Sequence, residues 1–333
     1  MGTDTMRSIV QDAYGTEPEA ILRVAEIARP TIGAGEVLVR VAAASVDRGT
    51  WHVMAGRPYL MRLMGYGLRR PSSTNPGRCL AGTVESVGAD VDGFAPGDEV
   101  YGTCSGSFAE YAKVDPGMLA RKPAGLSFGE AAAVPISAGT ALQAVRDKAD
   151  VQPGQTVVVV GASGGVGTFA VEIAKAFGAE VTGVCSPAKV DLVRGLGADH
   201  VVDYTVDDFA DGSRRYDVIL DIGGNRRLSD LRRALAPRGT LVIVGGETDG
   251  PLLGGFDRNL RAASLSPFVG QKLTMLASSE NAEDLDVLRG LIDAGKVHPA
   301  IDHTYPLHET AAAIRHLIDG RARGKIVVTV SDG

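Results

Sequence analysis

The chain has 333 residues, of which 44% are hydrophobic and 22% are charged, proportions that are ordinary for a globular protein of about two domains. The net charge of -6 shows no basic excess, which argues against a nucleic-acid partner. Neither a signal segment nor an apolar run long enough to span a bilayer is visible, so a membrane is not expected as a partner. The three cysteines, Cys79, Cys104 and Cys185, are odd in number and form no CxxC pair, which argues against a disulfide framework and a structural zinc site and fits a reduced, cytoplasmic setting.

The first part of the chain, to about residue 135, is predicted to consist mainly of strands. Residues 36–41 and 82–88 are the clearest, and the second of these alternates apolar and polar residues. Turn signals are dense between such segments, for example at Pro96-Gly97-Asp98. This spacing favours a barrel-like or sandwich-like domain.

From residue 156 onward, strands and helices alternate. Strands are expected at 156–160, 180–184, 200–203, 216–221 and 240–244, and helices at 166–177, 188–196 and 228–236. The alternation predicts an α/β fold with a doubly wound parallel sheet, to which 272–277 could add a sixth strand.

The last part of the chain, after about residue 279, changes character again. Residues 284–294 and 309–319 have the pattern of amphipathic helices, and residues 324–330 form a closing strand. That strand could rejoin the N-terminal domain, which would make the first domain discontinuous.

A glycine-rich turn follows the valine run at 157–160. Its sequence is Gly161-Ala162-Ser163-Gly164-Gly165-Val166-Gly167, and a helix is expected directly after it. In a strand–turn–helix unit of this kind, backbone N–H groups and the helix dipole hold a pyrophosphate, and glycine allows the close approach. The alternative interpretation is a tight structural turn, but the parallel-sheet pattern that follows favours a dinucleotide site.

The second strand of this unit indicates which nicotinamide cofactor is bound. An NAD site usually has Asp or Glu at the end of that strand, whereas this chain has Cys185-Ser186. Lys189 follows within one turn, and Tyr204 lies after the third strand. A cation and hydroxyl groups suit a 2′-phosphate, so we expect NADPH rather than NADH, unless Lys189 is only a surface lysine.

Motifs spread over nearly the whole chain fit one pattern. They are Ser45-Val46-Asp47, Gly77-Arg78-Cys79-Leu80-Ala81-Gly82, Pro96-Gly97-Asp98-Glu99-Val100, Gly106-Ser107-Phe108-Ala109-Glu110-Tyr111, Ala131-Ala132-Ala133-Val134-Pro135 and Gly197-Ala198-Asp199-His200-Val201-Val202-Asp203-Tyr204. Together they resemble the medium-chain dehydrogenase/reductase superfamily, and more narrowly its zinc-independent quinone oxidoreductase branch. Two positions depart from that branch, because Asp47 stands where it usually has Asn and Cys79 where it usually has Asp.

The resemblance implies a GroES-like catalytic domain at residues 1–137 and 280–333 and a Rossmann nucleotide-binding domain at residues 138–279. It also implies a homodimer formed through strand 272–277. It places a set of residues at the cofactor, with Thr140 at the nicotinamide half, the glycine-rich turn at the pyrophosphate, and Ser186, Lys189 and Tyr204 at the 2′-phosphate. Gly245 and Gly246 are expected near the nicotinamide.

The same resemblance allows a test for zinc. Where zinc-dependent members carry their metal ligands, this chain has Asp47, Arg78 and, approximately, Val134. Arginine is not a normal zinc ligand and valine has no donor atom. The histidines fit no metal-binding spacing either, so no metal is expected.

Without zinc there is no strong Lewis acid to activate a simple ketone, which favours a quinone or an α,β-unsaturated carbonyl as the hydride acceptor. Candidate catalytic residues are Asp47, Trp51, His52 and Tyr59, among which His52 or Tyr59 could donate a proton and Trp51 could wall an apolar pocket or simply pack in the core. Two alternatives remain open. One is an alcohol or carbonyl dehydrogenase, and the other is an NADPH-binding structural or sensing protein with little turnover.

Overall fold

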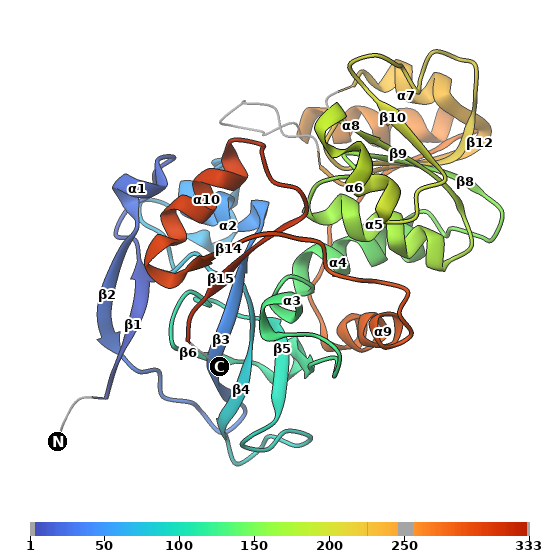
Figure 1. Cartoon of the computed structure of the whole chain (residues 1–333). Coiled ribbons are helices and arrows are strands. Elements are labelled where there is room, and N and C mark those ends of the chain that lie inside the picture. The colour runs from blue at the N-terminus through green and yellow to red at the C-terminus, as the bar shows by residue number, and fades with distance from the viewer. Residues whose placement is uncertain (1–3, 225, 246–255, 332–333) are drawn as a thin grey trace. The chain divides into compact units, whose positions relative to one another are not determined.

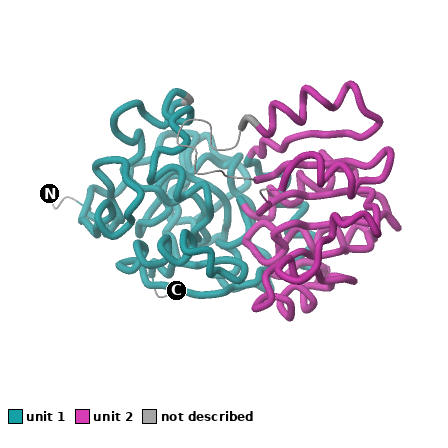
Figure 2. The backbone as a smooth tube through the Cα atoms, turned by 90° about the horizontal axis from the view of Figure 1, so that it is seen from above, with its two compact units in different colours: residues 1–136, 280–293, 299–333 teal, residues 137–279, 294–298 magenta. Residues whose placement is uncertain are grey.

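The computed structural model describes residues 4–224, 226–245 and 256–331 (Figure 1). The chain divides into two compact units, which are coloured separately in Figure 2. The first comprises Met1–Ile136, Glu280–Asp293 and Pro299–Gly333, and the second comprises Ser137–Ser279 and Ala294–His298. Within the described residues, no helix has the length and apolar character needed to cross a bilayer.

The second unit contains a six-stranded sheet in which all neighbouring strands are parallel. The strand order is β10 (His200–Asp203), β9 (Glu180–Cys185), β8 (Thr156–Val160), β11 (Tyr216–Asp221), β12 (Leu235–Ile243) and β13 (Lys272–Met275). The central strand β8 is a run of valines, and Val157, Val158 and Val159 are fully buried, as expected for a strand covered on both faces. The predicted doubly wound α/β class is confirmed.

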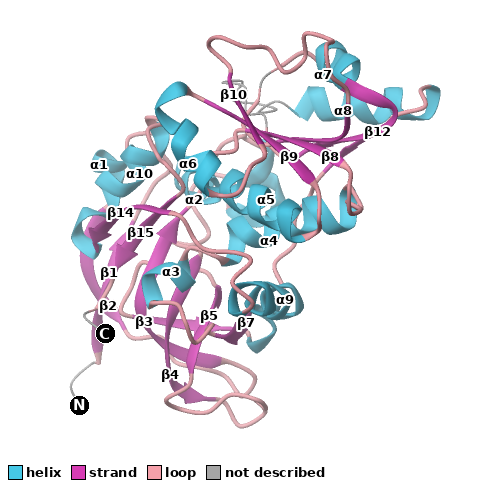
Figure 3. Ribbon diagram, turned by 45° about the vertical axis from the view of Figure 1, so that its right-hand side comes forward, coloured by secondary structure: helices cyan, strands magenta, loops and turns pink. Residues whose placement is uncertain are grey.

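Helices cover both faces of this sheet, as Figure 3 shows. They are α4 (Pro135–Gln143), α5 (Gly165–Ala176), α6 (Val190–Gly195), α7 (Leu228–Ala234) and α8 (Phe256–Leu265). The segment Ala294–His298 groups with this unit, although the sequence suggested that all of 280–333 belongs to the first domain. A physical reason is that the His298 N–H donates to the carboxylate of Glu172 on α5.

The first unit contains a seven-stranded sheet and a separate two-stranded one. The sheet order is β14 (Ile301–Pro306), β15 (Lys325–Thr329), β3 (Val37–Val46), β4 (Cys79–Val87), β5 (Glu99–Thr103) and β7 (Leu119–Arg121), with β6 (Tyr111–Val114) also paired to β3. The C-terminal strand β15 pairs antiparallel with β3, Ile326 opposite Val46, which confirms that the last strand returns to the N-terminal part. The two-stranded sheet joins β1 (Thr5–Val10) to β2 (Arg23–Ala28).

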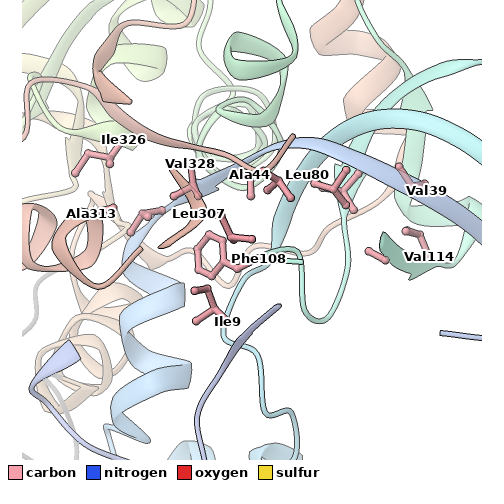
Figure 4. Packing of buried hydrophobic residues seen from close by; sticks show 14 of the residues in the cluster. Ile9, Val39, Ala44, Leu80, Phe108, Val114, Leu307, Ala313, Ile326 and Val328 are labelled. Atoms are coloured by element: carbon pink, nitrogen blue, oxygen red, sulfur yellow. The ribbon is translucent and has the colours of Figure 1, made fainter. Parts of the chain in front are cut away.

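The core of this unit lies around β3, β4 and β15 (Figure 4). Val39, Leu80, Phe108 and Val328 are fully buried there, and Ala313 reaches the same cluster from α10 (Thr310–Ile318). Three short helices also belong to this unit, namely α1 (Pro18–Ile21), α2 (Arg48–Ala55) and α3 (Phe128–Ala132), together with the longer α9 (Ala282–Asp293).

Some elements differ from the sequence-based expectation. Strand β14 was not predicted, because it is half exposed and contains His303 and Pro306 instead of an apolar alternation. The short helix α2 was not predicted either, and its signal is the capping residue Asp47 directly before it. Strand β13 ends at Met275, two residues earlier than expected.

Candidate functional site

The glycine-rich turn joins β8 to α5 in the second unit. Gly164 is the N-cap of α5 and has no side chain with which to cap the helix. The first N–H groups of a helix have no partner within the helix, so those of Gly165, Val166 and Gly167 are donors at the end of β8. Ser163 lies buried just before them. The turn therefore offers positive dipole ends and free donors, which is the chemistry that a pyrophosphate requires.

Two glycines make this close packing possible. A Cβ added to Gly167 would lie 2.0 Å from the carbonyl oxygen of Gly161, a distance at which no side chain fits. Gly161 itself has φ of +83°, and a Cβ there would lie 2.9 Å from the backbone nitrogen of Gly223. The turn thus brings the start of α5 directly against the end of β8, and it fits a dinucleotide phosphate on backbone geometry alone.

The ends of β9 and β10 lie next to the same sheet edge. Cys185 and Asp203 are register partners, so Ser186 and Tyr204, which directly follow them, leave adjacent strands side by side. The backbone N–H of Tyr204 donates to the carbonyl of Cys185 at 3.2 Å. Burial raises the pKa of the Cys185 thiol, Asp203 raises it further, and Lys189 opposes both, which places a positive charge beside these strand ends.

The remaining expected cofactor residues are only partly described. Thr140 lies half-buried on α4, and Gly245 follows β12, where its N–H donates to the carbonyl of Asp221 at 3.2 Å. Gly246 lies outside the described residues.

The candidate catalytic residues of the first unit lie on or beside α2. Asp47 is the N-cap of this helix and is 7% exposed. Its Oδ1 accepts from the Thr50 N–H at 3.1 Å, and its Oδ2 accepts from the Cys79 thiol at 3.6 Å. Both carboxylate oxygens are therefore engaged inside the protein, which gives Asp47 the geometry of a residue that positions the helix.

Trp51 and His52 stand on this helix with ring centroids 5.1 Å apart. Trp51 is half-buried and packs against the core cluster of this unit. This agrees with the second of its two predicted roles, packing in the core. His52 Nδ1 lies 2.6 Å from the carbonyl oxygen of Arg57. A carbonyl only accepts, so Nδ1 carries a proton, and Nε2 of neutral His52 is an acceptor. His52 can donate from Nε2 only as an imidazolium.

Tyr59 lies beyond the end of α2 and is 39% exposed. Its ring stacks with the guanidinium of Arg62, whose carbon lies 4.6 Å from the ring centroid. The phenol of Tyr59 thus stands at the surface end of the segment that carries the other three candidates.

Sequence reasoning missed a balanced group of charges beneath α2. Arg78 Nη2 lies 2.7 and 2.8 Å from the two carboxylate oxygens of Glu280. Lys325, only 1% exposed, donates to the carbonyl of Val46 at 3.2 Å. Both Asp47 and Lys325 act electrostatically on Cys79, and burial together with Asp47 raises the pKa of that thiol to about 12. Two cations and two anions are thus gathered here.

The strand order explains this convergence. Strands β15, β3 and β4 are neighbours, so Lys325 at the start of β15, Asp47 after β3 and Cys79 at the start of β4 meet at one end of the sheet. The pair Arg78–Glu280 spans 202 positions in the chain, so no local pattern could reveal it. The burial of Lys325 had only a weak local signal, its position at the start of the apolar strand β15, because lysine is rarely buried without a partner.

A cavity of about 390 Å³ opens next to this charged group, within the first unit. Arg78 and Glu280 line it together with Val53 of α2, Tyr66 and Cys104. The volume is in the range of small-molecule sites. Its wall combines apolar side chains with the Arg78–Glu280 ion pair, with Lys113 and Asp115, and with several hydroxyl and amide side chains, so a bound molecule would meet both apolar and polar surface.

The positions expected for zinc ligands hold other kinds of groups. Asp47 caps α2, Arg78 is paired with Glu280, and Val134 is fully buried. Within the part of the chain that the structure describes, no cluster of three His, Cys, Asp or Glu side chains could hold a metal ion. The residues present do not fit a catalytic zinc.

Comparisons with known proteins agree with this architecture. Residues 33–124 match the family model of the alcohol dehydrogenase GroES-like domain, and residues 196–328 match that of the zinc-binding dehydrogenases. The chain is 30% identical to quinone-oxidoreductase QR1 of Triphysaria versicolor, over 98% of this chain and 99% of that one. It belongs to the medium-chain dehydrogenase/reductase superfamily, in the quinone oxidoreductase-like branch.

Other members of the superfamily show similar agreement. The chain is 34% identical to the mitochondrial NAD(P)H oxidoreductase RTN4IP1 of Mus musculus, over 89% of this chain and 82% of that one. It is 32% identical to 2-methylene-furan-3-one reductase of Solanum lycopersicum, over 91% and 74% of the two chains. Oxidoreductases of this superfamily use nicotinamide cofactors and small-molecule substrates.

Solved structures of the superfamily superpose over nearly the whole chain. The quinone oxidoreductase from Coxiella burnetii has a TM-score of 0.82 and 27% identity, covering 98% of this chain and all of that one. An NAD-dependent alcohol dehydrogenase has a TM-score of 0.80 and 30% identity, with the same coverage. The expected membership of the superfamily and the expected GroES-like and Rossmann folds are confirmed.

The charged group suggests a test of Asp47. The branch pattern has Asn at position 47 and Asp at position 79. This chain instead has the carboxylate at position 47, where Asp47 accepts from the Cys79 thiol at 3.6 Å. We expect Asp47→Asn to lower the free energy of unfolding by about 3 kcal/mol, because it leaves buried positive charge without compensation. Adding Cys79→Asp should recover about 2 kcal/mol of that loss, since it returns a carboxylate to the same cluster.

Urea unfolding of the single and double variants measures these differences. The matched control is the pair Asp47→Asn with Cys79→Asn, which has nearly the same shape but no returned charge. If the two double variants are equally stable, a carboxylate at position 79 does not replace the one lost at position 47, which would contradict the prediction.

Proposed function

We propose that this protein is an NADPH-dependent, zinc-independent reductase of quinones or α,β-unsaturated carbonyls. The observation that carries the proposal is the replacement of the superfamily's metal ligands by a helix-capping carboxylate, Asp47, and an ion-paired guanidinium, Arg78. The names of the relatives in Triphysaria versicolor and Solanum lycopersicum, a quinone oxidoreductase and an enone reductase, support the same substrate class.

The cavity beside α2 is the proposed acceptor site. NADPH supplies a hydride when bound, and a conjugated acceptor then gains negative charge on its oxygen. The guanidinium of Arg78, held by Glu280, lines this cavity and can donate a hydrogen bond to that oxygen. Val53 and Tyr66 add apolar and aromatic surface to the wall of this cavity. The resulting enolate or hydroquinone anion needs one proton to complete the reduction.

His52 and Tyr59 are the proposed sources of this proton. The contact of His52 Nδ1 with the Arg57 carbonyl means that His52 must enter the reaction as an imidazolium and leave it neutral. Tyr59 would donate its phenolic proton directly. Asp47 contributes by fixing the start of α2, and thereby the direction in which His52 points.

The acceptor class can be tested by following NADPH oxidation with 1,2-naphthoquinone, a 2-alkenal and a simple ketone. We expect turnover with the first two, because a conjugated system needs less polarisation, and none with the ketone. Metal analysis of the same preparation should find no stoichiometric zinc. Ketone reduction with bound zinc would instead support an alcohol dehydrogenase, as the 30%-identical structure suggests. NADPH binding without any turnover would support a sensing or structural protein.

NADPH selectivity is proposed to come from the ends of β9 and β10. Ser186 and Tyr204 follow the ends of these two adjacent strands, Lys189 acts electrostatically on Cys185 at the same place, and no carboxylate ends β9, which supports a 2′-phosphate position there. We expect Lys189→Ala to raise the dissociation constant of NADPH about tenfold and to leave that of NADH unchanged, because a charge-assisted hydrogen bond contributes about 1.5–3 kcal/mol. Fluorescence titration with each nucleotide measures both constants.

The matched control is Lys296→Ala, which removes an exposed lysine of the same unit and should change neither constant. Ser186→Asp should shift preference toward NADH, since it places a carboxylate at the strand end. Equal effects of Lys189→Ala on both nucleotides would contradict the assignment.

A homodimer through β13 is the last part of the proposal. This strand ends its sheet, and Phe268, in the 3₁₀ turn just before it, is 85% exposed. An unpaired strand edge beside a bare aromatic ring is a typical site for pairing with a second copy. We expect light scattering to give twice the 34.6 kDa chain mass, and Phe268→Ser with Thr274→Lys to give monomers. Val206→Ser, an exposed site of the same unit, is the control. A monomeric native chain would overturn this part.

A further inference from the structure

One stretch of the chain has a charge opposite to that of the whole. Residues 48–84 contain six arginines and no acidic residue, whereas the complete chain has a net charge of -6. Four of these arginines fall within residues 57–70, which we call the arginine–leucine loop. Such a concentration of one sign in an acidic protein creates a local positive potential.

The same loop exposes large apolar side chains. Leu63 and Leu68 are 71% and 65% exposed, and Leu60 is 39% exposed. Tyr59 adds an aromatic ring at the start of the loop. Most exposed large hydrophobic side chains in the described part of the first unit thus gather within ten residues.

The exposure of these leucines is fixed by contacts on the inner side of the loop. The guanidinium of Arg62 lies between the rings of Tyr14 and Tyr59, at 4.3 and 4.6 Å from their centroids, and its Nε donates to the Gly56 carbonyl at 2.8 Å. The hydroxyl of Tyr14 lies 2.8 Å from the carbonyl oxygen of Gly67. The loop is therefore held in place while its leucines face outward.

The other arginines of the loop are available to an external partner. Arg69 and Arg70 are exposed and Arg57 is half-exposed. Among the described residues, no carboxylate lies within ion-pair distance of any of the three. Leu63 and Leu68 do not line the cavity beside α2, so a small molecule bound there would leave them bare. The occupant must be an extended surface that is both anionic and apolar.

We propose that the arginine–leucine loop docks the protein on the surface of an anionic lipid bilayer. A bilayer takes up leucine side chains without requiring a complementary shape, and it binds guanidinium groups at the depth of its phosphates. An acidic protein would satisfy the arginines but would need its own apolar pockets for Leu63 and Leu68. This inference does not depend on the redox chemistry proposed above.

The test is flotation of the full-length protein with vesicles of phosphatidylcholine, with and without phosphatidylserine. We expect binding to the phosphatidylserine vesicles that weakens as salt is added. Arg69→Glu with Arg70→Glu should lower the partition coefficient at least about thirtyfold, given about 1 kcal/mol per charge near an anionic surface. Leu63→Ser with Leu68→Ser should lower it about tenfold through lost apolar burial.

The matched control for charge is Arg238→Glu with Arg323→Glu, an equal reversal at two exposed arginines outside the loop. It should bind the vesicles as the native protein does. Hydrogen exchange should show protection of residues 57–70 when vesicles are present. The proposal is overturned if the native chain does not float, if both arginine pairs have the same effect, or if the protected segment lies elsewhere.

Discussion

The first unit depends on a balance of buried and half-buried charge around Asp47. Two positively charged side chains, Lys325 and Arg78, lie at one end of the sheet. Two negatively charged ones, Asp47 and Glu280, lie beside them. Because unpaired buried charge is expensive, strands β3, β4 and β15 and the segment before α9 must come together for this balance to hold. The same balance caps α2, so the constraint that closes the fold also orients His52.

The second unit depends on a different constraint, the approach of one backbone to another. The carbonyl of Gly161 lies where a side chain on Gly167 would have to be, so α5 begins directly at the end of β8. Here no charged side chain is required, since the donors are main-chain N–H groups. The two units thus form their polar sites by different means. The first unit uses charged side chains held in place, and the second uses main-chain N–H groups.

The sequence predicted the second unit more closely than the first, for a physical reason. Strands β8 and β11 fell at the predicted residues because buried parallel strands are continuous apolar runs, and the glycine spacing is local. In the first unit, Arg78 meets Glu280 across 202 positions, and β14 is half exposed and lacks alternation. Pairings of this kind are decided by the tertiary fold, which a pattern in a short window does not contain.

Averages over the whole chain, such as its net charge, also do not show which side chains the tertiary fold brings together at the surface. The net charge of -6 argues against a nucleic-acid surface, and the lack of a signal segment or a long apolar run suggested that no membrane would be a partner. A bilayer does not respond to the mean charge of a protein, because the field of distant acids is screened within about 10 Å at ordinary salt. It responds to the few groups that reach it. Arg69, Arg70, Leu63 and Leu68 stand together on a loop pinned by Arg62, and it is this local arrangement, not the average, that determines what the surface can bind.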